Sequence, residues 1–316
     1  MRRHTGANGG DIVRSGSPTF FGVPLAGDLR QIKADVAFLG IPFDMGTNDR
    51  PGSRFGPRLI RDASMRFAGI GRDGWYDIEE NRHILQGVRM VDGGDVNIRT
   101  VDFFTNFQKI TEAVAALRAT GALPVQVGGD HACTYPIVRA FTGRPLQVVQ
   151  FDAHLDYTDE WQGQRYSHDN QMRRISELPG VGLICHVGIR SLFERVEPVE
   201  AARGRGNVII PSKTIVEQGA HTAIERLPLT DAPCYVTIDI DVLSPSIAPG
   251  TGFPEPGGIS YYHLKEALIT LARRTTIVGF DVVEVAPWFD SPAAVTPRVA
   301  ARLMLDFLGA IFERRE

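Results

Sequence analysis

Three short stretches of the sequence combine aspartate and histidine in patterns that suit metal binding. In an extended chain, residues two positions apart point to the same side, so the acids and histidines of Asp152-Ala-His-Leu-Asp156 converge. The aspartates of Asp239-Ile-Asp241 converge in the same way, and Gly128-Gly-Asp-His131 adds a second imidazole. Any one of these groups alone would more often be a capping acid or a hydrogen-bonded core histidine. Together they predict a site for two divalent metal ions, with the ligands His131, Asp152, His154, Asp156, Asp239 and Asp241.

The ligand types narrow both the metal and the reaction. Carboxylates and imidazoles without thiolate suit a hard or borderline divalent ion, so we expect manganese ahead of nickel, cobalt or zinc. Two such ions about 3.5–4 Å apart lower the pKa of a shared water and present a nucleophile to an electrophilic carbon or phosphorus. The residues therefore predict metal-assisted hydrolysis. A binuclear phosphoesterase or deacetylase stays open on these grounds, although an acid such as Glu284 near the reacting centre would repel a phosphate.

The candidate ligands follow short apolar runs that predict strands buried on both faces. Such strands are typical of a parallel sheet covered by helices on each side. We therefore expect an α/β fold, a three-layer α/β/α sandwich with a mainly parallel central sheet. Predicted strands cover residues 34–41, 123–127, 146–151, 182–189, 208–210, 234–238 and 276–283. Helical patterns cover residues 107–118, 134–141, 262–272 and 297–312.

This architecture places the candidate ligands together. In open α/β sheets, ligands bind at the carboxyl ends of the strands. Each candidate follows a predicted strand: His131 after 123–127, the Asp152–Asp156 stretch after 146–151, the Asp239–Asp241 pair after 234–238, and Glu284 after 276–283. We therefore expect one rim of the sheet to carry all of these side chains.

Composition bounds the class of protein. The 316 residues are 43% hydrophobic and 22% charged, with a formal net charge of −3 and no basic stripe, which argues against a nucleic-acid partner. No stretch is long and apolar enough to predict a membrane span. Three separated cysteines without a C-x-x-C pair suggest a reducing, cytoplasmic setting. We expect an irregular N-terminal arm over residues 1–30 and a single domain over residues 31–316.

At these motifs the chain resembles the arginase/agmatinase family of ureohydrolases, in its agmatinase-type branch. The family motifs occur in family order as Val127-Gly-Gly-Asp-His131, residues 148–156, residues 237–250 and Gly279-Phe-Asp-Val-Val-Glu-Val285. The resemblance implies an arginase-like fold and two metal ions. It implies that His131, Asp152, Asp156 and Asp239 hold one ion and that Asp152, His154, Asp239 and Asp241 hold the other. A homo-oligomer, trimer or hexamer, is the family expectation.

The resemblance also implies a reaction. A hydroxide bridging the ions would attack a guanidinium carbon, and the intermediate would collapse to urea and an amine. Asp156 would pass the proton to the leaving nitrogen, and Glu284 would pair with the guanidinium, a role that bidentate carboxylate geometry suits. His168 would shuttle protons, a task that suits the near-neutral pKa of an ordinary imidazole. Beside it, Asp169 and Asn170 are candidate substrate contacts, and Asp169 stands where relatives usually have glycine. His186, within an apolar strand, is expected to be a core histidine.

Substrate choice rests on weaker signals. The segments at 40–47 and 50–57 resemble the agmatinase branch, so agmatine, giving putrescine, is the best candidate. The loop by which arginases recognise the α-amino and carboxylate groups of arginine is not evident after Asp156, so arginine is a weaker candidate substrate. The loop at 157–174 mixes acids, bases and aromatics, and Phe253 departs from the threonine usual in relatives, so guanidinobutyrate, guanidinopropionate, guanidine and alkylguanidines stay open. A non-catalytic assembly subunit would be expected to have lost ligands, and all six are intact.

Overall fold

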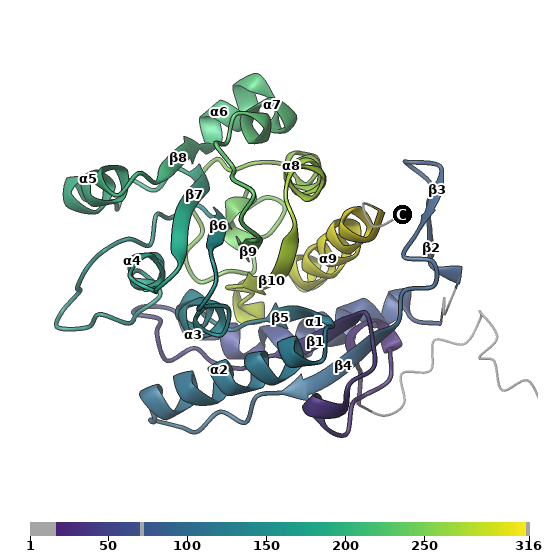
Figure 1. The fold of residues 1–316 in the computed structure, drawn as a ribbon. Helices are drawn as coiled ribbons and strands as arrows, with labels where there is room; N and C mark the ends of the chain where they lie inside the picture. Colours follow the sequence, from purple (N-terminus) through teal and green to yellow (C-terminus); the bar gives the residue numbers. More distant parts are fainter. Residues whose placement is uncertain (1–16, 70–72, 314–316) are drawn as a thin grey trace, which may run out of the picture.

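A central sheet of eight parallel strands forms the middle layer of the protein (Figure 1). The computed structural model describes residues 17–69 and 73–313. The strand order is β4-β1-β5-β10-β9-β6-β7-β8, and every pairing within this sheet is parallel. The strands are β1 Val36–Gly40, β4 Met90–Asp95, β5 Leu123–Val127, β6 Leu146–Phe151, β7 Val181–Ile189, β8 Val208–Pro211, β9 Cys234–Asp239 and β10 Ile277–Val283. A separate antiparallel hairpin joins β2 Trp75–Asp77 to β3 Arg82–Ile84.

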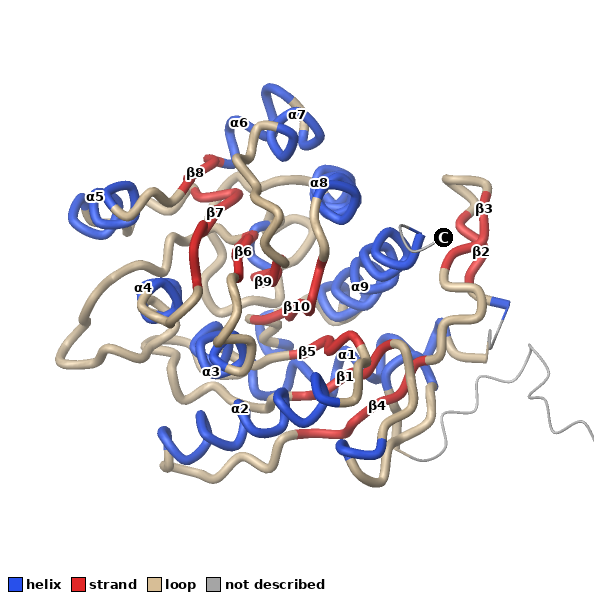
Figure 2. The backbone as a smooth tube through the Cα atoms, in the orientation of Figure 1, coloured by secondary structure: helices blue, strands red, loops and turns tan. Residues whose placement is uncertain are grey.

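Helices cover both faces of the sheet (Figure 2). One face carries α2 Phe103–Ala119, α3 Thr134–Arg139, α4 Gln171–Ser176 and α5 Val196–Gly204. The other carries α1 Gly56–Ser64, α6 Ser212–Gln218, α7 Ala220–Glu225, α8 Tyr261–Arg274 and α9 Val295–Glu313. The prediction of a three-layer α/β/α sandwich with a mainly parallel sheet is confirmed.

Alternation along the strands explains why both faces need a cover. In β1, Val36 and Phe38 join the core under α1, α8 and α9, whereas Ala37 and Leu39 join the core under α2 and α3. All four side chains are fully buried. Successive residues of a strand point to opposite faces, so a uniformly apolar strand needs an apolar layer on each side.

The sequence patterns did not predict β4. Its sequence, Met90-Val-Asp-Gly-Gly-Asp95, carries two glycines and two acids. Asp92 is nevertheless fully buried, because Arg61 of α1 donates to it from Nε at 2.8 Å and from Nη2 at 3.0 Å. The backbone N–H of Phe20 donates to the same carboxylate at 2.9 Å. The partners that make this polar strand possible come from distant parts of the chain, which local pattern does not reveal.

Two features bear on the expected domain layout. Within the predicted arm, residues 17–30 contain short 3₁₀ turns at Phe20–Gly22 and Leu29–Gln31, and Phe20 is buried in the core. The rest of the arm, residues 1–16, lies outside the described residues, so the boundary at residue 30 stays a prediction. Across the described ranges, no helix is both long enough and apolar enough to pass through a membrane.

Candidate metal centre and substrate cavity

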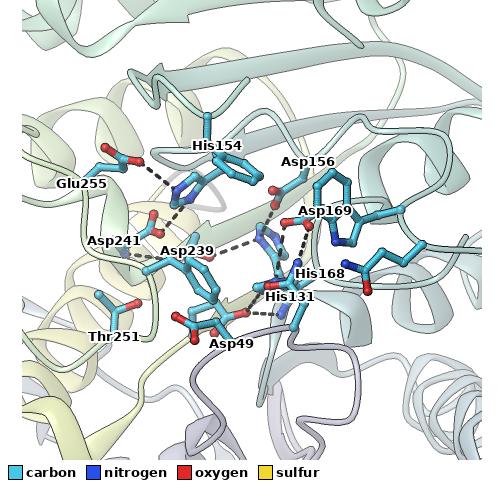
Figure 3. Close-up of a pocket in the computed structure, with 16 residues that line it drawn as sticks. Asp49, His131, His154, Asp156, His168, Asp169, Asp239, Asp241, Thr251 and Glu255 are labelled. Atoms are coloured by element: carbon cyan, nitrogen blue, oxygen red, sulfur yellow. Dashed lines mark hydrogen bonds and ion pairs between the residues drawn. The ribbon is translucent and has the colours of Figure 1, made fainter. Parts of the chain in front are cut away.

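Four neighbouring strands in the middle of the sheet bring the predicted ligands together. In the order β5-β10-β9-β6, their carboxyl ends lead directly to His131, Glu284, Asp239 and Asp152. All four residues are buried. Figure 3 shows side chains from these strand ends and the following loops around one cavity. The expected convergence at a single rim is therefore what the fold produces.

Histidine nitrogens and carboxylate oxygens form two groups with metal-ligand spacing. One group is His131, Asp152 and Asp239, and the other is Asp152, His154 and Asp241, with the donor atoms of each within 4.8 Å of one another. Asp152 belongs to both. His131 Nδ1 lies 3.0 Å from Asp152 Oδ2 and 3.2 Å from Asp239 Oδ2, while His154 Nδ1 lies 3.0 Å from Asp241 Oδ2.

Asp156 reaches the first group through the same histidine. Its Oδ2 lies 3.1 Å from His131 Nδ1, so three carboxylates surround one imidazole nitrogen. This nitrogen is buried, and in the part of the chain that the structure describes it has no hydrogen-bond partner of suitable geometry. An imidazole nitrogen among carboxylate oxygens supplies the mixed set of donor atoms that a shared cation needs.

The electrostatics of the cluster favour cations as well. Burial raises the pKa of Asp239, and the charges of Asp241 and Asp152 raise it further. Burial and the charge of Asp152 raise the pKa of Asp156 in the same way. Burial also opposes the ionisation of Asp152, but its contacts with His131 and His154 hold its pKa below the usual value. Two divalent ions would supply the positive charge that lets all of these acids ionise together.

Local backbone features hold the ligands in place. Gly129 approaches the loop after β1 so closely that an added Cβ would lie 1.6 Å from the carbonyl oxygen of Phe43. The carboxylate of Asp130 accepts backbone N–H groups of that loop, from Gly46 at 2.6 Å and Thr47 at 3.0 Å. The Gly-Gly-Asp sequence before His131 therefore ties two strand ends to each other, a structural task that leaves Asp130 outside the ligand set.

Comparisons with known proteins agree with this geometry. The family described as Arginase family matches residues 34–309. The chain belongs to the arginase family. Guanidinopropionase of Pseudomonas aeruginosa is 35% identical over 311 residues, covering 95% of this chain and 93% of the relative. Agmatinase of Pyrococcus horikoshii is 35% identical over 278 residues, covering 87% and 92%. The structure of proclavaminate amidino hydrolase from Streptomyces clavuligerus superposes with a TM-score of 0.83 at 31% identity, covering 93% and 96%.

As an arginase-family hydrolase, the protein has the residues that a binuclear centre requires. The donor set is four carboxylates and two imidazoles, and three of the carboxylates lie beside His131 Nδ1, which has no hydrogen-bond partner among the described residues. The predicted convergence of His131, Asp152, His154, Asp239 and Asp241 in two groups is observed, with Asp156 at the edge of the first.

Glu284 lies beside the cluster and is held by several donors. Its Oε1 accepts the backbone N–H of His131 at 2.8 Å and lies 3.4 Å from His168 Nδ1, while its Oε2 accepts the hydroxyl of Ser53 at 3.2 Å. Burial opposes its ionisation, but His168 and the N–H of His131 lower its pKa overall. The carboxylate is therefore ionised and faces the cavity that it helps to line.

Above the cluster, a cavity of about 410 Å³ opens toward solvent. Its floor is the histidine and aspartate cluster, and its walls add three aromatic rings and three further acids. The aromatic residues are Trp161, Phe193 and Phe253, and the acids are Asp49, Asp169 and Glu255. No lysine or arginine is among the described residues that line it. The Phe253 ring packs against His168, with centroids 4.9 Å apart.

The structure shows which charged and aromatic residues of the loop at 157–174 face the cavity. Trp161 and Asp169 line the cavity, whereas Arg174 of α4 pairs with Glu177 at 3.0 Å and with Asp159. Arg165 also pairs with Asp159, at 3.0 Å. Arg165, which is exposed, and Arg174, which is buried, thus pair with acids outside the cavity lining rather than facing the cavity.

The three predicted residues of the 168–170 segment lie in different surroundings. His168 and Asp169 line the cavity, and the Asp169 carboxylate accepts the amide of Asn48 at 2.7 Å. Asn170 is not among the lining residues. Its Oδ1 accepts the backbone N–H of Ser167 at 3.0 Å, and its Nδ2 donates to the carbonyl of Thr158 at 2.7 Å, so it holds the loop shape.

Sequence reasoning missed several lining residues. Glu255, Asp49, Phe193 and Thr251 come from loops whose acids and rings have no ligand-like spacing. The sequence shows that Phe253 replaces the threonine usual in relatives, but it does not show that the ring lines the cavity. Only the three-dimensional arrangement of three loops reveals that these side chains share one cavity.

Proposed function

We propose that this protein hydrolyses a guanidino compound to urea and an amine with the aid of two divalent metal ions. The observation that carries the proposal is a buried glutamate, Glu284, beside the histidine and aspartate cluster at the floor of a cavity, and the contacts of Glu284 with His168 and the N–H of His131 lower its pKa. A guanidinium matches that carboxylate in charge and in planar hydrogen-bond geometry. The same carboxylate would repel an anionic phosphate ester, which argues against the phosphoesterase alternative.

The ions would be held by His131, Asp152, His154, Asp156, Asp239 and Asp241. Bound there, the ions would lower the pKa of a water molecule, so that it could act as a nucleophile near neutral pH. Manganese is the better candidate and nickel the second, because the site offers carboxylate and imidazole without thiolate.

The protein's own residues would then orient the substrate and manage protons. Glu284 would fix the guanidinium so that its carbon faces the cluster. A water oxygen would bond to that carbon, the bond from the carbon to the tail nitrogen would break, and the nitrogen would leave as an amine after taking a proton, so that the remaining fragment is urea. Asp156 is the group that we propose delivers this proton, since its carboxylate lies beside His131 and lines the cavity, where it would take the proton from the attacking water and pass it to the leaving nitrogen. His168, in contact with Glu284, would pass protons between the cavity and solvent.

For the substrate tail, we propose an amine rather than an acid, with agmatine as the best candidate. The outer cavity carries Asp49, Asp169 and Glu255 and, among the described lining residues, no base to pair with a carboxylate. Glu255 lies 3.6 Å from His154 Nε2 and accepts Ser191 Oγ at 2.9 Å, and these contacts lower its pKa. The rings of Trp161 and Phe193 offer apolar walls for a methylene chain.

The decisive experiment is urea release from a substrate panel. The purified protein, loaded separately with manganese and nickel, is given agmatine, guanidinobutyrate, guanidinopropionate, arginine, guanidine and methylguanidine, with Asp239→Asn as the inactive control. We expect agmatine to be hydrolysed best. Preference for a guanidino acid would contradict the acidic-wall argument, and preference for guanidine or methylguanidine would mean that the aromatic rings close the outer cavity.

Glu255→Gln tests directly whether an acid of the outer cavity contacts the substrate tail. Removing its charge should raise the KM for agmatine by about 2–5-fold, as expected for the loss of one partly exposed ionic contact, and should leave methylguanidine hydrolysis nearly unchanged. Glu160→Gln, an exposed glutamate outside the cavity lining, is the matched control. An equal effect of both substitutions would argue against a tail contact at Glu255.

Two further expectations belong to the proposal. A cytoplasmic location is favoured by the three buried free cysteines, Cys133, Cys185 and Cys234. A homo-oligomer, trimer or hexamer, is expected by analogy with the family, and sedimentation of the purified protein measures it.

A further inference from the structure

Behind the metal cluster, three buried polar side chains connect neighbouring strands to Asp152. Gln150 lies on β6, His186 is its partner across the register on β7, and Asn207 directly precedes β8. Gln150 and His186 are fully buried, and Asn207 is 7% exposed. The sequence analysis treated His186 as an ordinary core histidine, and none of the three residues lines the cavity.

The hydrogen bonds of these side chains form one continuous chain that ends on Asp152. Asn207 Nδ2 lies 3.1 Å from His186 Nε2, and His186 Nδ1 lies 2.5 Å from Gln150 Oε1. Gln150 Nε2 then donates to Asp152 Oδ2 at 2.6 Å and to the carbonyl of His154 at 3.2 Å.

The direction of the chain is forced from its Asp152 end. An ionised carboxylate only accepts, so Gln150 must present its amide nitrogen to Asp152 and its oxygen to His186. His186 must then carry its proton on Nδ1. The ring is then neutral, and its unprotonated Nε2 accepts a hydrogen bond from Asn207 Nδ2. Burial lowers the pKa of His186 to about 3, in agreement with a neutral ring.

We propose that Asn207, His186 and Gln150 form a positioning relay that fixes the carboxylate of Asp152 for two metal ions. The proposal rests on the proposed role of Asp152 as the ligand common to both groups. While Gln150 holds Oδ2, the backbone N–H of His154 holds Oδ1 at 2.6 Å, so neither oxygen is free to rotate away. Outer hydrogen bonds of this kind orient metal ligands, and their loss commonly costs about 10–100-fold in metal affinity.

The same strand provides a matched control. Gln147 of β6 is also buried, and its amide donates to the carbonyls of Thr230 and Ala232 and to Thr275 Oγ1, at the end of the strand away from the cluster. Gln150→Leu and Gln147→Leu therefore remove the same group from the same strand. Only the first removes a contact with Asp152.

The test measures Mn²⁺ binding to the metal-free protein by calorimetry, together with bound manganese after dialysis. We expect Gln150→Leu to weaken binding by about 10–100-fold and Gln147→Leu to leave it within about two-fold, even where both lower the melting temperature. Equal weakening by the two substitutions would overturn the proposal. Because this readout involves no substrate, normal metal binding without urea release would count against the proposed function alone.

A double-mutant cycle tests whether His186 acts through Gln150. We expect His186→Phe to weaken Mn²⁺ binding by about 10-fold in the native background and to have no further effect in Gln150→Leu. Additive effects would overturn the relay.

A measurement on the unsubstituted protein does not depend on any variant folding. Nitrogen-15 spectra of labelled histidine should show His186 neutral with its proton on Nδ1, between pH 6 and pH 9. A charged ring, or a proton on Nε2 alone, would overturn the proposed direction.

Discussion

At the scale of single residues, two acids of the site have unusual backbone conformations. Asp156 has φ 54° and Glu284 has φ 60°, in the left-handed region that residues other than glycine seldom adopt. Each such conformation costs on the order of 1–3 kcal/mol and persists only where the surroundings enforce it. Both acids follow the ends of central strands, and both face the cavity. The fold thus holds these carboxylates in directions that a relaxed chain would not choose.

Glu284→Gln should remove activity while keeping the metal centre. The amide retains the size of the side chain but loses the charge that pairs with a guanidinium, so kcat/KM should fall by about 100-fold or more. Mn²⁺ content measured by elemental analysis should be unchanged, because Glu284 belongs to neither ligand group. Glu217→Gln, on the exposed surface of α6, serves as the control, and retained activity in Glu284→Gln would contradict the proposed role.

His168 should give the metal-free protein a distinct pH dependence. Burial opposes its protonation, but Glu284 and Asp169 raise its pKa to about 9 in the folded protein, above the unfolded value of about 6.5. A raised pKa means that the stabilisation is complete below about pH 6.5 and is lost as pH rises through about 9. The contribution is on the order of 3 kcal/mol.

The comparison that isolates this effect is His168→Asn against the unsubstituted protein, both treated with chelator, in thermal unfolding from pH 5 to pH 10. The difference in melting temperature should be largest near pH 6 and nearly absent above pH 9. A difference that is constant with pH would show that the charge of His168 does not stabilise the fold.

At this scale, the sequence predicts the ligands better than the cavity walls. Asp152, His154 and Asp156 are recognisable because their spacing along one extended segment already aligns them. Glu255 and Asp49 reach the cavity only through the shape of long loops. In the sequence, the relay residues Gln150 and His186 are only single polar positions within apolar strands. They become hydrogen-bond partners because β6 and β7 pair in the sheet, and this pairing is not visible in the sequence.

At the scale of secondary structure, β7 supports the metal centre through a glycine. Gly188 has φ +102°, and an added Cβ would lie 2.9 Å from the carbonyl oxygen of Asp152 and 2.5 Å from Val242 Cγ2. Gly188→Ala should therefore destabilise the protein by about 1–3 kcal/mol and also weaken metal binding. Gly182, on the same strand, has no atom closer than 3.8 Å and no unusual φ, so Gly182→Ala is the control.

Differential scanning calorimetry with and without Mn²⁺ checks this prediction. Gly188→Ala should melt earlier than Gly182→Ala in the metal-free state, and the gap should widen when metal is present. Equal melting of the two variants would mean that the contact between β7 and Asp152 is not critical.

The strands and long helices were predictable because their apolar patterns are strong. Predicted strands at 123–127 and 146–151 coincide with β5 and β6, and the pattern at 262–272 lies within α8. The short helices α4 to α7 and the strand β4 were not predicted. The helices α4 to α7 span at most nine residues, too few for a strong periodic pattern, and β4 depends on a contact with a distant segment, the Arg61–Asp92 ion pair.

At the scale of the whole molecule, metal binding should be linked to folding. Four buried carboxylates meet in the native state, and the unfolded chain does not assemble them, so ions bind the native state preferentially. Manganese at 100 times its Kd should add about 2.7 kcal/mol of stability per site. Thermal unfolding with chelator and with added Mn²⁺ measures the shift. Asp239→Asn should lose most of it, and an equal shift in that variant would place the ions elsewhere.

The proposed metal ligands lie at or just after the ends of the central strands, whereas the outer cavity walls come from the loops that follow them. Asp239 and Asp152 are fixed by the sheet, but Trp161, Phe193 and Phe253 sit on separate loops. The residues proposed to break the bond and those proposed to select the substrate therefore lie on different structural elements, although the two sets alternate along the chain. Exchanging these loops should therefore change which substrate is accepted while leaving the histidine and aspartate cluster in place.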